Sequence, residues 1–203
     1  MGELADSYDQ IFPTRSGDLV PVFNFACGCC AACTQGWSVY CAHPAIGDLL
    51  CAVPRRVGAQ RALTLLMVVS AFLSAAVDDS AVVLAASEEG NVLAGLLRCV
   101  HKGSVLVAPS FRNTDVKVRL AQLSSTGRAD VIVTSLSGRD AVMVVKRGGV
   151  VCLPRTDIEM PSVTELAQRE VRIFGPQSVS AVVKIIGRPL VESVFRQDLG
   201  ATL

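Results

Sequence analysis

Short valine-rich runs alternate with amphipathic segments between residues 80 and 154. The apolar runs are SAVVLA (80–85), GSVLVAP (103–109), ADVIVTS (129–135) and GGVVCLP (148–154). The segments between them, at 90–100, 115–125 and 138–147, have helical spacing. This alternation is typical of βαβ units, which place parallel strands in one sheet. It predicts an α/β fold, and the composition suits an aliphatic interior, because 51% of the 203 residues are hydrophobic and only 5% are aromatic.

Residues 62–77 (ALTLLMVVSAFLSAAV) are the one candidate for a membrane span. A spanning helix needs about 18–20 apolar residues, whereas this segment is shorter and is interrupted by Thr64, Ser70 and Ser74. We therefore expect a buried helix over about residues 59–77 and no membrane partner.

The first ten residues, MGELADSYDQ, do not fit a secretory signal, because they lack a basic region followed by an apolar one. The expectation is a cytoplasmic protein in which the eight cysteines stay reduced. Clustered reduced cysteines favour metal binding over disulfide formation.

The loop CGCCAACTQGWSVYC (27–41) carries the most specific signal in the chain. Gaps of two, two and seven residues separate Cys27, Cys30, Cys33 and Cys41. A tetrahedral Zn²⁺ binds four thiolates, and a shell closed by protein ligands indicates a structural site. Cys29 falls outside this spacing. The alternatives are a set of buried or reactive thiols, or a redox dithiol formed by Cys30 and Cys33.

Several other functions lack support in the sequence. The formal net charge is +1 and no basic stripe stands out, which argues against nucleic-acid binding. There is no P-loop and no G-x-S-x-G elbow. The acidic pairs Asp78-Asp79 and Glu88-Glu89 consist of adjacent residues, which seldom act as an acid–base pair. We interpret the first pair as a helix stop and His101 as a solvated turn residue.

Residues 16–44 (SGDLVPVFNFACGCCAACTQGWSVYCAHP) resemble the structural-zinc lobe of the medium-chain, zinc-containing alcohol dehydrogenase/reductase family. There a GD-x-V strand leads into the same four-cysteine spacing. The segment CAVPRRVGAQRALTLL (51–66) is similar to the family's link into its cofactor domain, and residues 128–153 are similar to its later half-sheet.

This resemblance spans about residues 17–198 and implies a Rossmann-like parallel sheet with a small β-rich structural-zinc lobe. Residues 1–55 would be the remnant of a catalytic domain. Residues 56–203 would form the Rossmann-like domain, with a linking helix and a C-terminal remnant. The family's catalytic-zinc cysteine and Gly-His-Glu motif have no counterpart, because His43 and His101 lie in other contexts. We therefore expect a chain shortened at both ends.

The dinucleotide fingerprint also departs from the family. In place of G-x-G-x-x-G the chain has Ala85-Ala86-Ser87-Glu88-Glu89-Gly90, so only Gly90, which allows close helix–strand packing, is kept. A helix N-terminus attracts phosphate, but Glu88 and Glu89 place negative charge there. One unit charge at about 4–6 Å costs on the order of 1–4 kcal/mol. We interpret Ser87 as the N-cap of this helix.

The second predicted strand ends in VLVAPSFRN (105–113), without the acidic residue that holds the ribose hydroxyls of NAD. Arg112, with Ser110 nearby, could in principle meet a 2′-phosphate, which makes NADP conceivable although disfavoured; the favoured interpretation of Arg112 is a solvated loop residue. If a dinucleotide binds, Ser87, Gly90, Ser110 and Arg112 are its candidate contacts.

Two functional hypotheses follow. In the first, the chain is a zinc-binding, alcohol-dehydrogenase-like protein without hydride transfer, which serves as a repurposed biosynthetic enzyme or an assembly partner. In the second, it is an NADPH-dependent reductase or dehydrogenase that acts on a carbonyl or enone without catalytic zinc. The altered fingerprint favours the first, and no catalytic residue is assigned.

The resemblance further implies a homodimer that pairs through the edge of the cofactor-domain sheet. The apolar segments REVRIFG (169–175) and SAVVKIIG (180–187) are the expected edge, and an exposed edge of this kind needs covering. A small-molecule substrate is compatible with either hypothesis.

Overall fold

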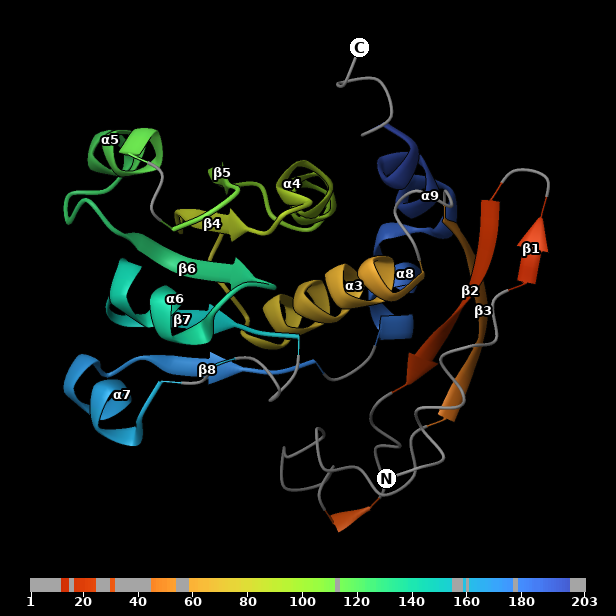
Figure 1. The fold of residues 1–203 in the computed structure, drawn as a ribbon, viewed down its shortest axis with the longest axis horizontal. Coiled ribbons are helices and arrows are strands. Elements are labelled where there is room, and N and C mark those ends of the chain that lie inside the picture. Colours follow the sequence, from red (N-terminus) through yellow and green to blue (C-terminus); the bar gives the residue numbers. More distant parts are fainter. Residues whose placement is uncertain are drawn as a thin grey trace.

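The structure is a computed structural model that describes residues 12–14, 17–24, 30–31, 45–53, 59–111, 114–154, 159, 161–176 and 179–197. These residues contain two sheets (Figure 1). The smaller is antiparallel, in the order β1-β2-β3, with the strands β1 (Phe12–Thr14), β2 (Gly17–Asn24) and β3 (Ala45–Val53).

The larger sheet is parallel and has the strand order β5-β4-β6-β7-β8. Its strands are β4 (Val83–Ala86), β5 (Val105–Ala108), β6 (Ala129–Thr134), β7 (Val145–Cys152) and β8 (Arg172–Phe174). The short valine-rich runs form β4 to β7, as the sequence predicts. Buried parallel strands are covered on both faces, so they appear as continuous apolar runs. The predicted α/β, Rossmann-like fold is confirmed.

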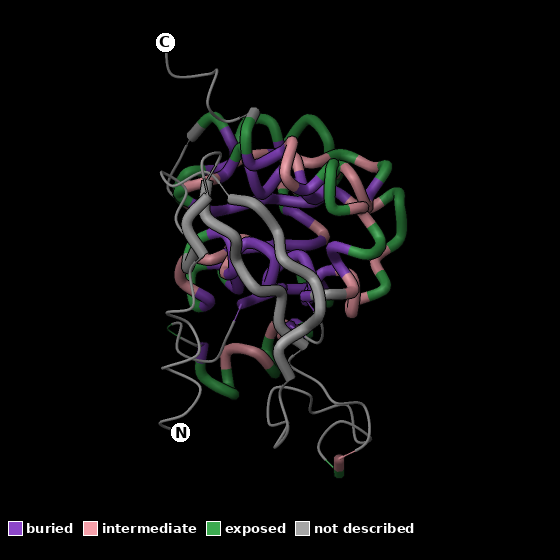
Figure 2. Tube along the Cα trace, turned by 90° about the vertical axis from the view of Figure 1, so that its right-hand side faces the viewer, coloured by how far each residue is buried: buried purple, intermediate pink, exposed green. Residues whose placement is uncertain are grey.

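Helices cover both faces of this sheet. One face carries α3 (Ala59–Ser74), α4 (Gly90–Arg98), α8 (Val179–Ile186) and α9 (Arg188–Gln197). The other carries α5 (Thr114–Leu123), α6 (Gly138–Val144) and α7 (Val163–Arg169). Side chains alternate along each strand, so β4 directs Val83 and Ala85 into the first core and Leu84 and Ala86 into the second. Figure 2 shows buried residues at the centre and exposed ones along the outer helices.

Helix α3 is the predicted buried helix. It lies against α8, β2 and the parallel sheet, and Leu65, Leu66 and Val69 on it are fully buried. This covering explains why the helix is apolar on most sides. None of the helices in the described ranges has the length and apolar character needed to cross a bilayer.

The order of the strands reverses beside β4. The chain passes from β4 through α4 to β5, and then through α5 back past β4 to β6. The full dinucleotide-binding sheet has the order 3-2-1-4-5-6. In that scheme position 1 is β4 and position 2 is β5. Positions 4, 5 and 6 are β6, β7 and β8. Between β5 and β6, where only residues 112 and 113 lie outside the described part, the chain forms α5 and no strand for position 3.

Two predicted elements differ in the structure. Helix α6 ends at Val144 and β7 begins at Val145, three residues before the predicted end of the helix, because Val145 is buried in the second core and Lys146 pairs with Asp130. The segment SAVVKIIG forms most of α8 and is not a sheet edge. Val179, Val182 and Val183 are buried at helical spacing on one face of α8, so of the two predicted edge segments only REVRIFG contributes an edge strand, β8.

The interpretation of His101 as solvated is wrong. The residue is 3% exposed, and its Nε2 lies 3.0 Å from the Ala81 carbonyl oxygen, to which it donates. Its ring meets the edge of Phe72 at 5.6 Å between centroids. His101 is therefore a core residue that joins the segment between α4 and β5 to the end of α3 and to Ala81, two residues before β4.

Candidate functional site

The candidate site lies at the carboxyl ends of β4 and β6, where the strand order reverses. Ligands of open α/β sheets bind in the crevice at such a switch point. Ser87 follows β4 and Ser135 follows β6. The Ser135 hydroxyl donates to Ser87 Oγ at 2.9 Å, and the Ser135 N–H donates to the Ala86 carbonyl at 3.3 Å. The Ser87 N–H donates to the Ala108 carbonyl at 3.2 Å, so three strand ends are joined here.

The Ser87 side chain is fully buried and bonded to Glu89. Its hydroxyl donates to Glu89 Oε2 at 3.3 Å and accepts the Glu89 N–H at 3.2 Å. The N-cap residue of α4 is Glu89, which makes no capping bond with its own side chain. The interpretation of Ser87 as the N-cap is therefore wrong. Ser87 closes a turn two residues before the helix, because its hydroxyl bonds to residue 89 rather than to the first helical turn.

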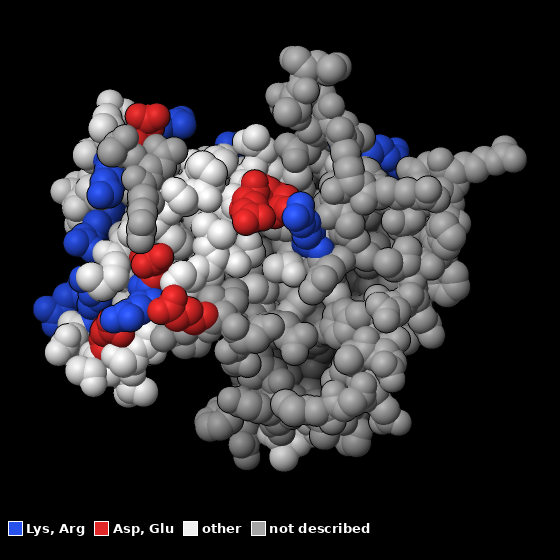
Figure 3. All heavy atoms as spheres, in the orientation of Figure 1, with Lys and Arg blue, Asp and Glu red and all other residues white. Residues whose placement is uncertain are grey.

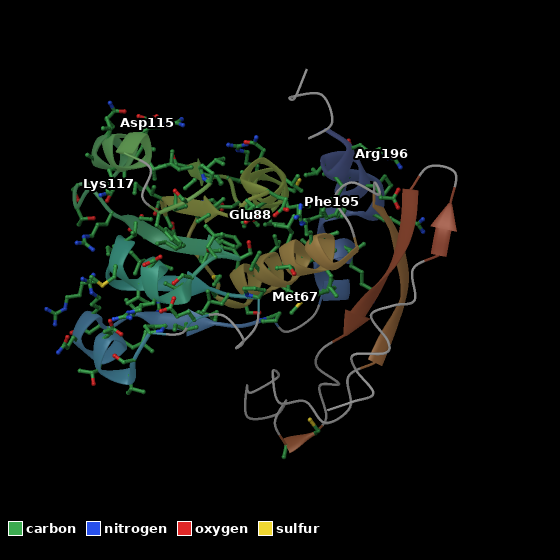
Figure 4. All side chains as sticks on the ribbon, viewed as in Figure 1. Met67, Glu88, Asp115, Lys117, Phe195 and Arg196 are labelled. Atoms are coloured by element: carbon green, nitrogen blue, oxygen red, sulfur yellow. The ribbon has the colours of Figure 1, made fainter. Side chains whose placement is uncertain are left out.

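Arg61 completes this group of side chains, which we call the Ser87 network (Arg61, Ser87, Glu89 and Ser135). Arg61 Nη1 lies 3.2 Å from Glu89 Oε1, with side chains 62% and 18% exposed respectively. Glu88 is exposed at the tip of β4 between α3 and α4 (Figure 4). Arg61 offsets one of the two carboxylates, so Glu88, Glu89 and Arg61 together carry a net charge of about −1. The repulsion of a phosphate is smaller than two uncompensated acids would produce.

Arg61 was missed by sequence reasoning because it comes from the start of α3, far along the chain from Glu89. No local pattern marks such a pair. In the space-filling view, acidic and basic side chains adjoin near the middle of the face (Figure 3).

Gly90 has the packing role expected from the sequence. A Cβ atom built on Gly90 would lie 2.7 Å from Val107 Cγ1, closer than side chains tolerate. Only glycine lets α4 begin so near β5. This role is structural and does not depend on a cofactor.

The other predicted contacts are only partly visible. Ser110 is exposed just after β5, on the same edge of the sheet as Ser87, and Arg112 lies outside the described residues. Of the predicted zinc ligands, Cys30 is half-buried, whereas Cys27, Cys33 and Cys41 also lie outside. Within the described ranges no three His, Cys, Asp or Glu side chains gather as metal ligands. The structural zinc stays a prediction.

A hollow of about 520 Å³ is lined by Arg139, Glu159, Ser162 and Glu165. Arg139 reaches both carboxylates, with Nη1 3.8 Å from Glu159 Oε1 and Nε 3.4 Å from Glu165 Oε1. Hydrogen bonds from the Ser162 backbone and hydroxyl hold the pKa of Glu165 below its usual value. Arg139 on α6 thus forms ion pairs with Glu159 and with Glu165 on α7, which explains these residues as supports for α6 and α7.

Comparison with known proteins finds solved structures with a similar fold. No family model and no curated protein matches the sequence. Among solved structures, an NAD-dependent alcohol dehydrogenase is similar with a TM-score of 0.56 at 16% identity, over 88% of this chain and 66% of that one. The fold is dehydrogenase-like. Alcohol dehydrogenase TADH from Thermus sp. ATN1 gives 0.53 at 15% identity, over 91% and 74% of the two chains. A cobalt- and zinc-bound thermostable alcohol dehydrogenase from Pyrobaculum aerophilum gives 0.51 at 14%, over 92% and 68%.

These similarities support, at the level of the fold, the resemblance to zinc-containing alcohol dehydrogenases. At such identities they concern the fold alone. The chain spans just under two thirds of the NAD-dependent alcohol dehydrogenase.

Proposed function

We propose that this chain is an alcohol-dehydrogenase-like protein without hydride transfer, which serves as a non-redox biosynthetic enzyme or an assembly partner. The observation that carries the proposal is the strand order. A dinucleotide-binding sheet is built from two βαβαβ halves, each of which binds one mononucleotide. Here the first half contains only β4, α4 and β5, since α5 leads directly back to β6. One half of the dinucleotide cradle is therefore incomplete.

The residues at the end of β4 also argue against dinucleotide binding. A diphosphate needs a close backbone approach and unopposed N–H groups at the helix N-terminus. The buried Ser87 side chain stands at the second glycine position, and the Glu89 carboxylate lies beside the first turn of α4. A remaining net charge of −1 at about 4–6 Å disfavours each phosphate by on the order of 1–4 kcal/mol. The residues at this corner do not fit a dinucleotide diphosphate.

Cofactor titration tests the proposal. NADPH and NADH are added to the purified chain, and binding is followed by nicotinamide fluorescence and by melting temperature. We expect no saturable signal with either one at micromolar concentration. A ligand that binds only the folded state at a hundred times its Kd would add about 2.7 kcal/mol of stability, so binding would be plain. Saturable stabilisation in the micromolar range would overturn the proposal.

The second candidate is an NADPH-dependent reductase or dehydrogenase that acts on a carbonyl or enone without catalytic zinc. Two features favour it. No acidic residue occupies the end of β5, where Ala108, Pro109 and Ser110 follow one another, and Arg61 supplies a cation beside the turn. A 2′-phosphate would meet no carboxylate from β5. Saturable binding of NADPH but not of NADH would select this candidate.

We also propose a structural zinc on Cys27, Cys30, Cys33 and Cys41, because four thiolates are a preferred donor set for Zn²⁺. Metal analysis of the purified chain should find about one zinc per chain, and the Cys30→Ser/Cys33→Ser variant should hold none. A stably folded wild type without zinc would contradict this. A homodimer through β8 is proposed as well, and light scattering that gives a monomer mass would refute it.

A further inference from the structure

We infer that one end of the parallel-sheet domain is a docking surface for a protein partner whose segment is acidic and carries an apolar anchor. The arginine surface consists of Arg128, Met143, Arg147 and Arg169. Arg128 precedes β6, Met143 lies in the last turn of α6, Arg147 lies in β7 and Arg169 ends α7. Figure 3 shows Lys and Arg side chains gathered at the left-hand end, where the strands begin.

The fold brings these residues together from separate parts of the sequence. Arg128 Nη1 donates to the Met143 carbonyl at 2.7 Å, and Arg169 Nη1 donates to the same carbonyl at 3.4 Å. Arg147 Nη2 donates to Glu170 Oε1 at 2.7 Å, which places it beside the end of α7. A net charge of +1 for the whole chain does not reveal this concentration of positive charge.

The positive charge of the arginine surface is largely uncompensated. Arg147 pairs with Glu170, but no described carboxylate forms an ion pair with Arg128 or Arg169. By contrast, Arg61 and Arg139, elsewhere on the molecule, each face a carboxylate. The set of Arg128, Arg147, Arg169 and Glu170 carries a net charge of about +2, which attracts a partner of opposite charge.

Two of the guanidinium groups are held in place by the fold. Arg128 and Arg169 donate to carbonyls of residues 142–145 at the C-terminal end of α6, where cations complement the helix dipole. Each uses a single nitrogen for these bonds, so the others keep donors for an incoming carboxylate. Because these side chains are already ordered, less conformational entropy is lost on binding.

Met143 adds an exposed apolar side chain to the arginine surface. Its side chain is 49% exposed, while its carbonyl receives the two arginines. Methionine and arginine are enriched at protein interfaces, and the flexible thioether adapts to the shape of an apolar partner side chain. The described aromatic side chains, Phe72, Phe111, Phe174 and Phe195, pack against the two cores. The surface therefore lacks the stacking platform typical of single-strand nucleic-acid binding, and a protein segment fits better.

Fluorescence anisotropy with the full chain tests the inference. The probe is a short fluorescein-labelled peptide of repeated Glu-Glu-Leu units, compared with one in which Ser replaces every Glu. We expect binding of the acidic peptide alone, weakened several-fold between about 0.05 M and 0.3 M salt. Arg147→Glu should weaken binding about tenfold, since Arg147 is 71% exposed and its ion pair with Glu170 lies at the surface. Lys184→Glu on α8 makes the same charge change elsewhere and should leave binding unchanged.

Met143→Ser should weaken binding of the Glu-Glu-Leu peptide several-fold but leave binding of polyglutamate of equal length unchanged. Arg128→Lys/Arg169→Lys keeps the charge and should retain salt-sensitive binding with reduced affinity, and its melting curve reports whether α6 stays folded. The inference fails if the acidic peptide does not bind, or if Arg147→Glu and Lys184→Glu have equal effects. It also fails if a single-stranded oligonucleotide of equal length binds more tightly than the peptide.

Discussion

Replacing Ser87 with alanine tests whether the switch-point corner is held by its own side chains. The Ser87 hydroxyl takes part in three hydrogen bonds: it donates to the Glu89 carboxylate and accepts from the Glu89 N–H and from Ser135 Oγ. A typical hydrogen bond contributes about 0.5–1.5 kcal/mol net, and one to a charged group contributes more. Because Ser87 is fully buried, water does not readily replace these partners. We expect Ser87→Ala to lower the free energy of unfolding by about 2–4 kcal/mol.

Ser135→Ala is the matched control, because it removes only one of these bonds through its side chain and Ser135 is half-buried. We expect it to cost about 0.5–1.5 kcal/mol. Equilibrium urea unfolding, followed by circular dichroism and fitted with a common m-value, measures both. If Ser87→Ala cost no more than Ser135→Ala, the hydroxyl would not hold the corner together. The assignment of Ser87 to structure rather than to ligand binding would then be wrong.

Three further predictions concern packing, pH and thiol reactivity. Gly90→Ala should destabilise the fold by about 1–3 kcal/mol, since the new Cβ would lie 2.7 Å from Val107 Cγ1; adding Val107→Ala should recover part of the loss in the same urea assay. The hydrogen bonds from Ser162 lower the pKa of Glu165 in the folded state, so their stabilisation is present above the unfolded-state pKa and is lost as the pH falls through the folded value. Ser162→Ala should therefore destabilise the fold more at neutral pH than in acid, as measured by urea unfolding across a pH series. Cys152 is fully buried and burial raises its thiol pKa, so a thiol reagent should label it at neutral pH only after unfolding, as mass spectrometry of the labelled peptide can show.

The sequence located β4 to β7 well because each is a continuous apolar run flanked by turn residues. The prediction that SAVVKIIG (180–187) belongs to the sheet edge was wrong for the same reason, since a short apolar run fits a buried strand or a buried helix equally. The choice is made by tertiary packing, in which Val179, Val182 and Val183 meet α3 at helical spacing. His101 was misjudged because a histidine next to Lys102 and Gly103 looks like a solvent turn, and only the fold places Phe72 against its ring.

The candidate site could be located from sequence but not described in detail. The degenerate fingerprint at residues 85–90 places it at the end of β4, and Gly90 has the expected packing role. The partner of Glu89 is an arginine from another helix, which no local pattern predicts. The strand order was also beyond reach, because an alternation of strands and helices does not say which strands are neighbours. Only the pairing of β4 with both β5 and β6 shows that position 3 is skipped.

The missing third strand has a consequence at β5, which becomes an edge of the sheet. The carbonyls of Ser104 and Ala108 accept N–H groups on the β4 side, so the carbonyl of Val105 faces the other way. Arg98 Nη2 donates to that carbonyl at 3.2 Å, and Pro109 directly follows the four-residue strand. Short strands, flanking prolines and long cationic side chains are the usual protection of an exposed edge. A five-stranded sheet whose outer strand is protected in this way does not need a strand at position 3 to cover its edge, and the proposed loss of dinucleotide binding rests on this arrangement.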